Sequence, residues 1–94
     1  MKTLIWSKTF ARAFKRIIKK HPDQSNVIEN ALRLLAEDPF VPQLETHKLK
    51  GRLSGSWACR AGYDLRIIFD FVPNKDQKEE GIFLMEIGTH DEVY

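Results

Sequence analysis

The sequence predicts a single α+β domain in which an antiparallel sheet carries a helical hairpin on one face. Three observations indicate it: two amphipathic helices in succession, a hairpin of alternating strands after them, and a last apolar strand. Ninety-four residues suffice for one modest hydrophobic core and are too few for two, so we expect residues 1–94 to form one domain. An apolar fraction of 43% with a charged fraction of 30% is typical of a folded chain.

The first half of the chain predicts one short strand and two helices. Residues 3–6 are rich in β-forming side chains, and Ser7 can cap the following helix by accepting a hydrogen bond from its backbone. Residues 8–20 repeat apolar side chains at helical spacing and end before Pro22, because the residue before a proline is driven out of the helical region. A second apolar stripe predicts a helix over residues 23–37. The connection is so short that we expect an antiparallel helical hairpin.

The second half predicts the rest of the sheet. Residues 40–56 have no clear period and are interpreted as a long loop, which in a small domain is often functional. Residues 57–71 alternate about Gly62, whose tolerance of positive φ suits a tight turn between two strands. Residues 74–80 are interpreted as a charged turn, and the near-continuous apolar residues 81–87 as a central strand.

Composition excludes several classes of protein. The single cysteine, Cys59, rules out an internal disulfide and a cysteine-based zinc site, and alternation places it on the core side. No run approaches the roughly 18 apolar residues that a membrane span needs. The N-terminal MKTLIWSKTF has neither the apolar core nor the cleavage site of a signal peptide, so we expect a cytoplasmic protein.

The net charge of +2 conceals an asymmetry. Residues 1–60 hold twelve Lys/Arg and five Asp/Glu, a net charge of +7, while residues 61–94 hold three and eight, a net charge of −5. A basic half on a folded core favours an anionic partner, of which nucleic acid is the commonest. The competing interpretation is that the basic helix faces are simply solvated.

The hairpin offers a site for phosphate. If it is symmetric about Tyr63, then Arg60, Asp64 and Arg66 share the sheet face that the helices do not cover. Two guanidinium groups provide planar, permanently charged donors that can grip a phosphate. The alternative is that Asp64 merely pairs with an arginine on a solvated face.

Two histidines flank this face and add proton-transfer chemistry. His47 lies on the loop leading into the hairpin and His90 follows the last strand. Histidines around arginines can cleave RNA without metal: one group takes the 2′-hydroxyl proton, arginine stabilises the phosphorane, and another group protonates the leaving 5′-oxygen. Each histidine alone could equally be an ordinary surface residue. No HxH or HExxH spacing indicates a metal, and we expect no cofactor.

Three stretches together resemble a known family. They are His47–Gly51 (HKLKG), the hairpin Trp57–Phe69 and the ending Ile87–Tyr94 (IGTHDEVY). Over essentially the whole chain the sequence resembles the RelE/ParE toxin superfamily, and most of all its YafQ-like RelE branch. The resemblance implies a β-α-α-β-β-β fold and the toxin of a type II toxin–antitoxin module. It further implies a ribosome-dependent endoribonuclease that cleaves mRNA and is held inactive by a cognate antitoxin protein.

The same resemblance assigns roles to residues. His47 matches a catalytic loop histidine, and His90 matches a histidine that acts as acid or base. Arg60 stands where the YafQ toxin has a second histidine, a departure that moves the site toward the basic site of RelE. The expected catalytic set is His47, Arg60, Asp64, Arg66, His90 and Tyr94, and the expected RNA-binding set is Lys8, Arg12, Lys15, Lys48, Lys50 and Arg52.

Two other functions stay open at this point. A ParE-type toxin has the same fold but binds and inhibits DNA gyrase, and it would not need His47 or His90. A degenerate, inactive toxin retained with its antitoxin is also compatible with the sequence. The two histidines around the arginine face favour RNA cleavage over gyrase binding.

Overall fold

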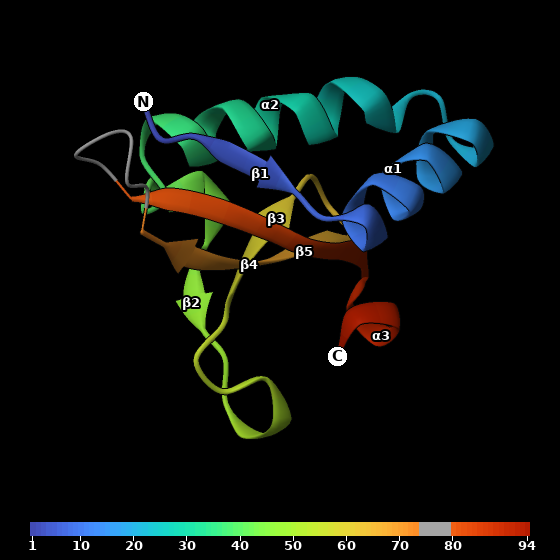
Figure 1. The fold of residues 1–94 in the computed structure, drawn as a ribbon. Helices are drawn as coiled ribbons and strands as arrows, with labels where there is room; N and C mark the ends of the chain where they lie inside the picture. The colour runs from blue at the N-terminus through green and yellow to red at the C-terminus, as the bar shows by residue number, and fades with distance from the viewer. Residues whose placement is uncertain (74–79) are drawn as a thin grey trace.

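The computed structural model describes residues 1–73 and 80–94 and arranges them as a five-stranded sheet with three helices (Figure 1). The predicted charged turn over residues 74–80 lies outside the described residues except for Glu80. The strands are β1 (Leu4–Trp6), β2 (His47–Lys48), β3 (Trp57–Ala61), β4 (Leu65–Val72) and β5 (Gly81–Thr89). The helices are α1 (Lys8–Lys20), α2 (Gln24–Glu37) and α3 (His90–Val93), and two short 3₁₀ turns cover Pro42–Leu44 and Gly51–Leu53.

The sheet has the strand order β1-β5-β4-β3-β2 and is mixed, which corrects the expectation of a fully antiparallel sheet. β1 pairs with β5 in parallel, and the other neighbours are antiparallel. The reason lies in α2, which runs back along the sheet to the end where β1 begins (Figure 1). There the backbone N–H of Lys2 donates to the carbonyl of Ala36 at 2.8 Å. The short strand β2 that follows α2 runs antiparallel to β3, and both β3 and β5 run in the same direction as β1.

Both long helices cover one face of the sheet, as predicted. They bury Phe10, Ile28 and Leu35 against Ile67 and Phe69, and all five side chains are fully buried. Fully burying a side chain of this size contributes roughly 1.5–3 kcal/mol. The odd-numbered side chains of β4 thus face the helices, and its even-numbered side chains face the other way. This confirms the register predicted for the hairpin.

Ser7 fixes the start of α1 to the sheet. Its side-chain oxygen accepts from the backbone N–H of Phe10 at 3.0 Å, which confirms the predicted cap. The same hydroxyl donates to the carbonyl of Met85 at 3.1 Å, beside the register shift between β4 and β5. One side chain therefore joins α1 to the middle of β5.

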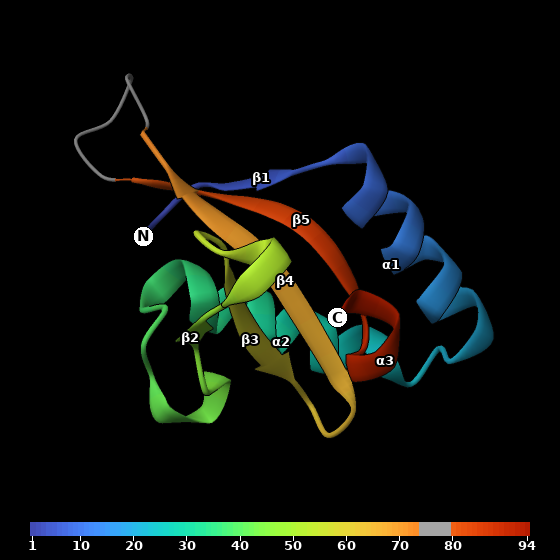
Figure 2. The ribbon, with the colours of Figure 1, turned by 90° about the horizontal axis from the view of Figure 1, so that it is seen from below.

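Two further segments differ from the prediction. The loop over residues 40–56 contains the short edge strand β2, in which His47 is the partner of Ala58. The last strand continues to Thr89 instead of ending at Ile87, and the expected polar tail folds as α3. The loop that follows β2 and the helix α3 lie on the face of the sheet away from α1 and α2 (Figures 1 and 2). Among the described residues, no helix is long and apolar enough to cross a membrane.

Candidate active site

The sheet face opposite the long helices carries a second, smaller hydrophobic cluster. It consists of buried Ala58, Ile68 and Val93, with Met85 and Tyr94 packed partly against it. Val93 and Tyr94 come from the C-terminal segment, so α3 is anchored on this face beside β4 and β5 (Figure 2). The cluster provides a rigid floor, and the polar side chains next to it on β2, β3 and β4 form the candidate site.

Arg60 and Arg66 stand at the centre of this face. They are direct cross-strand partners in the β3–β4 ladder, so both guanidinium groups project from the same side of the sheet. Nε of Arg60 donates to the carbonyl of Gly62 at 2.7 Å, and its Nη1 donates to Oε2 of Glu45 at 2.6 Å. Nη1 of Arg66 donates to the carbonyl of Leu65 at 3.0 Å. In the described part of the chain no carboxylate forms an ion pair with Arg66, which leaves its charge available to an anion.

Glu45 is a site residue that the sequence analysis missed. Its backbone is left-handed, with a φ of 48°, and this bend turns the carboxylate toward Arg60. The hydrogen bond and charge of Arg60 hold the pKa of Glu45 below its usual range, with smaller contributions from Arg66 and His47. The signal available in the sequence was an acidic residue two positions before His47. The left-handed backbone of Glu45, which turns its carboxylate toward Arg60, could not be predicted from the sequence.

His47 is oriented by the same bend. Its Nδ1 lies 2.9 Å from the carbonyl oxygen of Glu45. A carbonyl can only accept, so Nδ1 carries the proton and Nε2 of the neutral ring keeps a free lone pair. Glu45, His47, Arg60 and Arg66 together line a cavity of about 120 Å³. The site thus joins a histidine that can accept a proton to two cations that can hold an anion.

His90 and Tyr94 stand on the other side of Arg66. Their rings meet edge to face, with centroids 4.5 Å apart. The Tyr94 hydroxyl oxygen is buried and has no hydrogen-bond partner within the described residues. Burial raises the pKa of Tyr94, and the charge of Arg66 partly offsets this. At neutral pH the hydroxyl is therefore protonated.

The two histidines occupy opposite ends of the site. The strand order places His47 of β2 beyond Arg60, whereas His90 follows β5 beyond Arg66. Three strand spacings, about 14 Å in all, separate the β2 and β5 backbones. His47 and His90 therefore approach an anion bound at the arginine pair from opposite sides.

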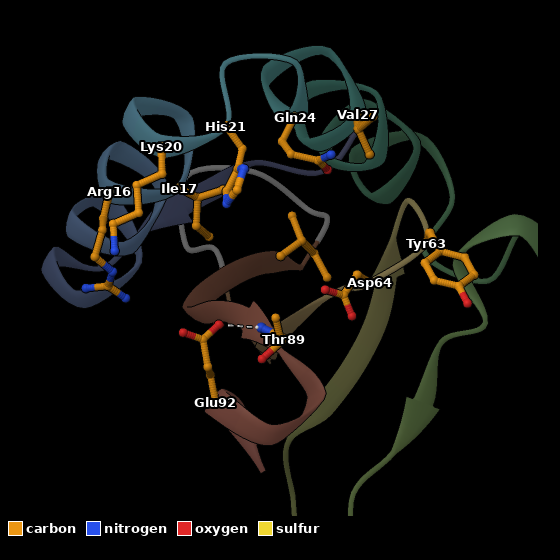
Figure 3. A pocket seen from close by; sticks show the side chains of 11 residues that line it. Arg16, Ile17, Lys20, His21, Gln24, Val27, Tyr63, Asp64, Thr89 and Glu92 are labelled. Atoms are coloured by element: carbon orange, nitrogen blue, oxygen red, sulfur yellow. Dashed lines mark hydrogen bonds between the residues drawn. The ribbon is translucent and has the colours of Figure 1, made fainter.

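Asp64 lies apart from the arginine pair. It occupies the turn over residues 62–64, where the alternation of side chains along the strands no longer applies. Its side chain lines a different cavity of about 740 Å³, between the long helices and α3, with Arg16 and Glu92 among the other lining residues (Figure 3). The structure brings together His47, Arg60 and Arg66 and leaves Asp64 around the end of the sheet.

The basic residues expected to bind RNA come from two regions, and all six are exposed. One group lies in and after β2, the edge strand beside the site. Within it, Lys48 is the cross-strand partner of Trp57, which packs against the helix-side core, and Nζ of Lys48 stands 5.9 Å from the centre of that ring. The other group belongs to α1, which covers the sheet face opposite the site. The first group comprises Lys48, Lys50 and Arg52, and the second comprises Lys8, Arg12 and Lys15.

The described residues 1–73 and 80–94 contain no group of three His, Cys, Asp or Glu side chains that could hold a metal ion. Cys59 is fully buried under the helices, and burial raises the pKa of its thiol to about 12. It is therefore a core residue and no part of the site.

A small α+β domain with this strand order has the fold of solved bacterial toxin structures such as YafQ from E. coli. Residues 2–94 match the family of YafQ, described as the bacterial toxin of a type II toxin–antitoxin system, and the chain belongs to this family. No curated protein sequence matches the chain.

Solved structures share the fold along the whole chain. A metal-bound toxin from Helicobacter pylori is 29% identical with a TM-score of 0.72, and the alignment covers 100% of both chains. YafQ from E. coli is 18% identical with a TM-score of 0.77, over 100% of this chain and 99% of that one. YafQ in the E. coli DinJ–YafQ complex is 19% identical with a TM-score of 0.76, over the same shares of the two chains.

Proposed function

We propose that this toxin is a ribosome-dependent, metal-independent endoribonuclease that cleaves mRNA in the cytoplasm. The observation that carries the proposal is the cavity in which His47 meets Arg60 and Arg66. A proton acceptor beside two fixed cations is the arrangement that transesterification of a phosphodiester requires. Family membership supports the same conclusion.

The proposed reaction assigns one role to each side chain of the site. Nε2 of His47 takes the proton of the ribose 2′-hydroxyl, whose oxygen attacks the neighbouring phosphorus. Arg66 and Arg60 stabilise the added negative charge of the phosphorane, and Tyr94 supports the ring of His90 through their edge-to-face contact. His90 gives a proton to the departing 5′-oxygen. The products are a 2′,3′-cyclic phosphate and a 5′-hydroxyl end, and no water is consumed in this step.

Binding of the RNA chain rests on the basic groups. Lys50 and Arg52, which follow β2, contact the phosphates next to the cleaved bond, and Lys48 contacts the RNA chain from the edge of the sheet beside Trp57. The exposed basic residues of α1 lie on the far face, where they suit the phosphates of ribosomal RNA better than those of the substrate. His47 is preferred over Asp64 as the base, because Asp64 lines the other cavity and not the one that holds the arginines.

The toxin also has a cognate antitoxin protein. E. coli YafQ forms a complex with DinJ, which supports such a partner for this chain. The antitoxin is expected to cover part of the basic surface or to displace the C-terminal segment. Co-expression of the neighbouring gene should yield a stable complex, and a benign, monomeric chain at high yield without it would argue against an active toxin.

Cleavage can be tested with the purified chain, ribosomes and a defined mRNA. We expect cuts that persist in EDTA, and mapped 5′ ends should carry hydroxyl groups. His47→Ala and His90→Ala should each lower the rate about 10²–10⁴-fold, the usual contribution of a proton-transfer group. His21→Ala is the matched control, because His21 lines the other cavity. Full toxicity of both site variants together with blocked gyrase supercoiling would instead establish the ParE-type activity.

A further inference from the structure

The helix that carries His90 is too short to hold itself in place. α3 spans only His90–Val93, and a single helical turn is unstable in isolation because helix nucleation is unfavourable. One hydrogen bond closes the turn, from the backbone N–H of Tyr94 to the carbonyl of His90 at 3.1 Å. The orientation of His90 and Tyr94 must therefore be fixed by side chains.

Glu92 and Thr89 supply that support as a reciprocal capping box. Oε1 of Glu92 accepts from the backbone N–H of Thr89 at 2.8 Å (Figure 3). The Thr89 side chain in turn accepts from the backbone N–H of Glu92. The two hydrogen bonds hold the backbone N–H groups of Thr89 and Glu92, which stand on either side of His90 and Asp91. Their loss would free the segment that carries the histidine.

Gly88 determines how closely α3 can fold back onto the sheet. A Cβ at this position would lie 3.1 Å from Cβ and Oε1 of Glu92 and from Cγ1 of Val93. Gly88 is also the cross-strand partner of Arg66. The contact of α3 with this glycine therefore sets the distance between the α3 side chains and Arg66.

The other side of Glu92 faces the cavity of about 740 Å³. Arg16 and Lys20 of α1 reach toward it from across this space (Figure 3). The Thr89 hydrogen bonds hold the pKa of Glu92 below its usual range, with a smaller contribution from Arg16 and Lys20. Glu92 is thus ionised at neutral pH, and its strongest partners are the groups of the capping box.

We propose that Glu92 is a positioning residue, which acts through the capping box with Thr89 to hold His90 and Tyr94 against Arg66. The catalytic part of this inference rests on the proposed nuclease function, because positioning has a kinetic meaning only if His90 transfers a proton. The structural part stands on the hydrogen bonds and on the close approach at Gly88.

The test compares Glu92→Ala with Glu92→Gln. Glutamine keeps the acceptor of the capping box and removes the charge, whereas alanine removes both. Loss of a cap shifts a helix equilibrium roughly 2–30-fold. We expect Glu92→Ala to lower kcat about tenfold with KM unchanged, and Glu92→Gln to stay within about twofold of the natural chain, because only the orientation of the proton donor is lost.

An activity-independent measurement accompanies the kinetics. NMR should show cross-relaxation between the ring protons of His90 and Tyr94 in the natural chain and in Glu92→Gln, and a much weaker signal in Glu92→Ala. Thr89→Val should behave like Glu92→Ala, and Thr89→Ser like the natural chain.

Two outcomes would overturn the proposal. One is an unchanged ring contact in Glu92→Ala, and the other is a loss in Glu92→Gln as large as that in Glu92→Ala. If the natural chain cleaves no RNA, the nuclease proposal fails, and the ring contacts alone decide whether Glu92 holds His90 in place.

Discussion

Arg60 and Arg66 lie directly opposite each other on β3 and β4, two like charges at the closest cross-strand position. Such a pair destabilises a sheet, so folding alone does not account for it. Glu45 neutralises only one of the two, because its carboxylate pairs with Arg60. The remaining charge is an electrostatic cost that binding of an anion would offset.

Replacing Arg66 should therefore separate activity from stability. Arg66→Ala is expected to lower RNA cleavage about 10²–10³-fold, the usual loss for one transition-state donor. Its free energy of unfolding should stay within about 0.5 kcal/mol of the natural chain, because the lost backbone hydrogen bond is offset by relief of repulsion. Cleavage assays and urea unfolding measure the two effects. Arg33→Ala, on the exposed face of α2, is the control that should change neither.

The ion pair of Glu45 and Arg60 should make the stability of the site loop depend on pH. The folded-state pKa of Glu45 is lowered from 4.5, so its stabilising contribution is present above that value and is lost as the pH falls through the lowered pKa. Glu45→Gln should unfold at lower urea than the natural chain at pH 7, and this difference should shrink in acid. Glu29→Gln, on α2, is the charge-matched control. A difference that is constant with pH would contradict the assignment.

The thiol of Cys59 should be inert in the folded chain. With a pKa raised to about 12 by burial, only roughly one thiol in ten thousand is ionised at pH 8. Ellman's reagent should react slowly with the native protein and rapidly once denaturant is added. Fast labelling of the native protein would mean that β3 opens readily under α2.

Local sequence signals were sufficient to predict most of the fold. Ser7 and Pro22 bound α1 because capping and proline sterics act within a few residues. The turn at Gly62 fixed the hairpin register, and with it the pairing of Arg60 with Arg66. The parallel pairing of β1 with β5 could not be predicted in this way, because it depends on where α2 returns the chain.

The candidate site was predictable only in part. Strand periodicity placed the two arginines on one face, but it could not place Asp64, which belongs to the turn. Glu45 acts through a left-handed backbone that no residue type in the loop signals. The position of Glu92 in the site depends on the close approach of α3 to Gly88, a contact that exists only in the folded chain.

The hairpin turn should be sensitive to a single methyl group. Gly62 has a φ of 67°, and a Cβ there would overlap Cγ1 of Val27 on α2. Gly62→Ala should lower the free energy of unfolding by about 2 kcal/mol or more, since the left-handed conformation alone costs about 1 kcal/mol and the overlap adds to it. The carbonyl of Gly62 also accepts from Nε of Arg60, so RNA cleavage should fall with stability.

Gly51 provides the control for this prediction. Its φ of 70° nearly equals that of Gly62, yet nothing lies within 4 Å of the position of its Cβ. Gly51→Ala should therefore show the backbone cost alone, about 1 kcal/mol in urea unfolding. A double-mutant cycle isolates the overlap: Gly62→Ala with Val27→Ala should be more stable than the sum of the single changes implies, because the smaller side chain makes room for the new methyl group. If Gly51→Ala and Gly62→Ala lower the free energy of unfolding equally, then Val27 of α2 does not crowd the turn at Gly62.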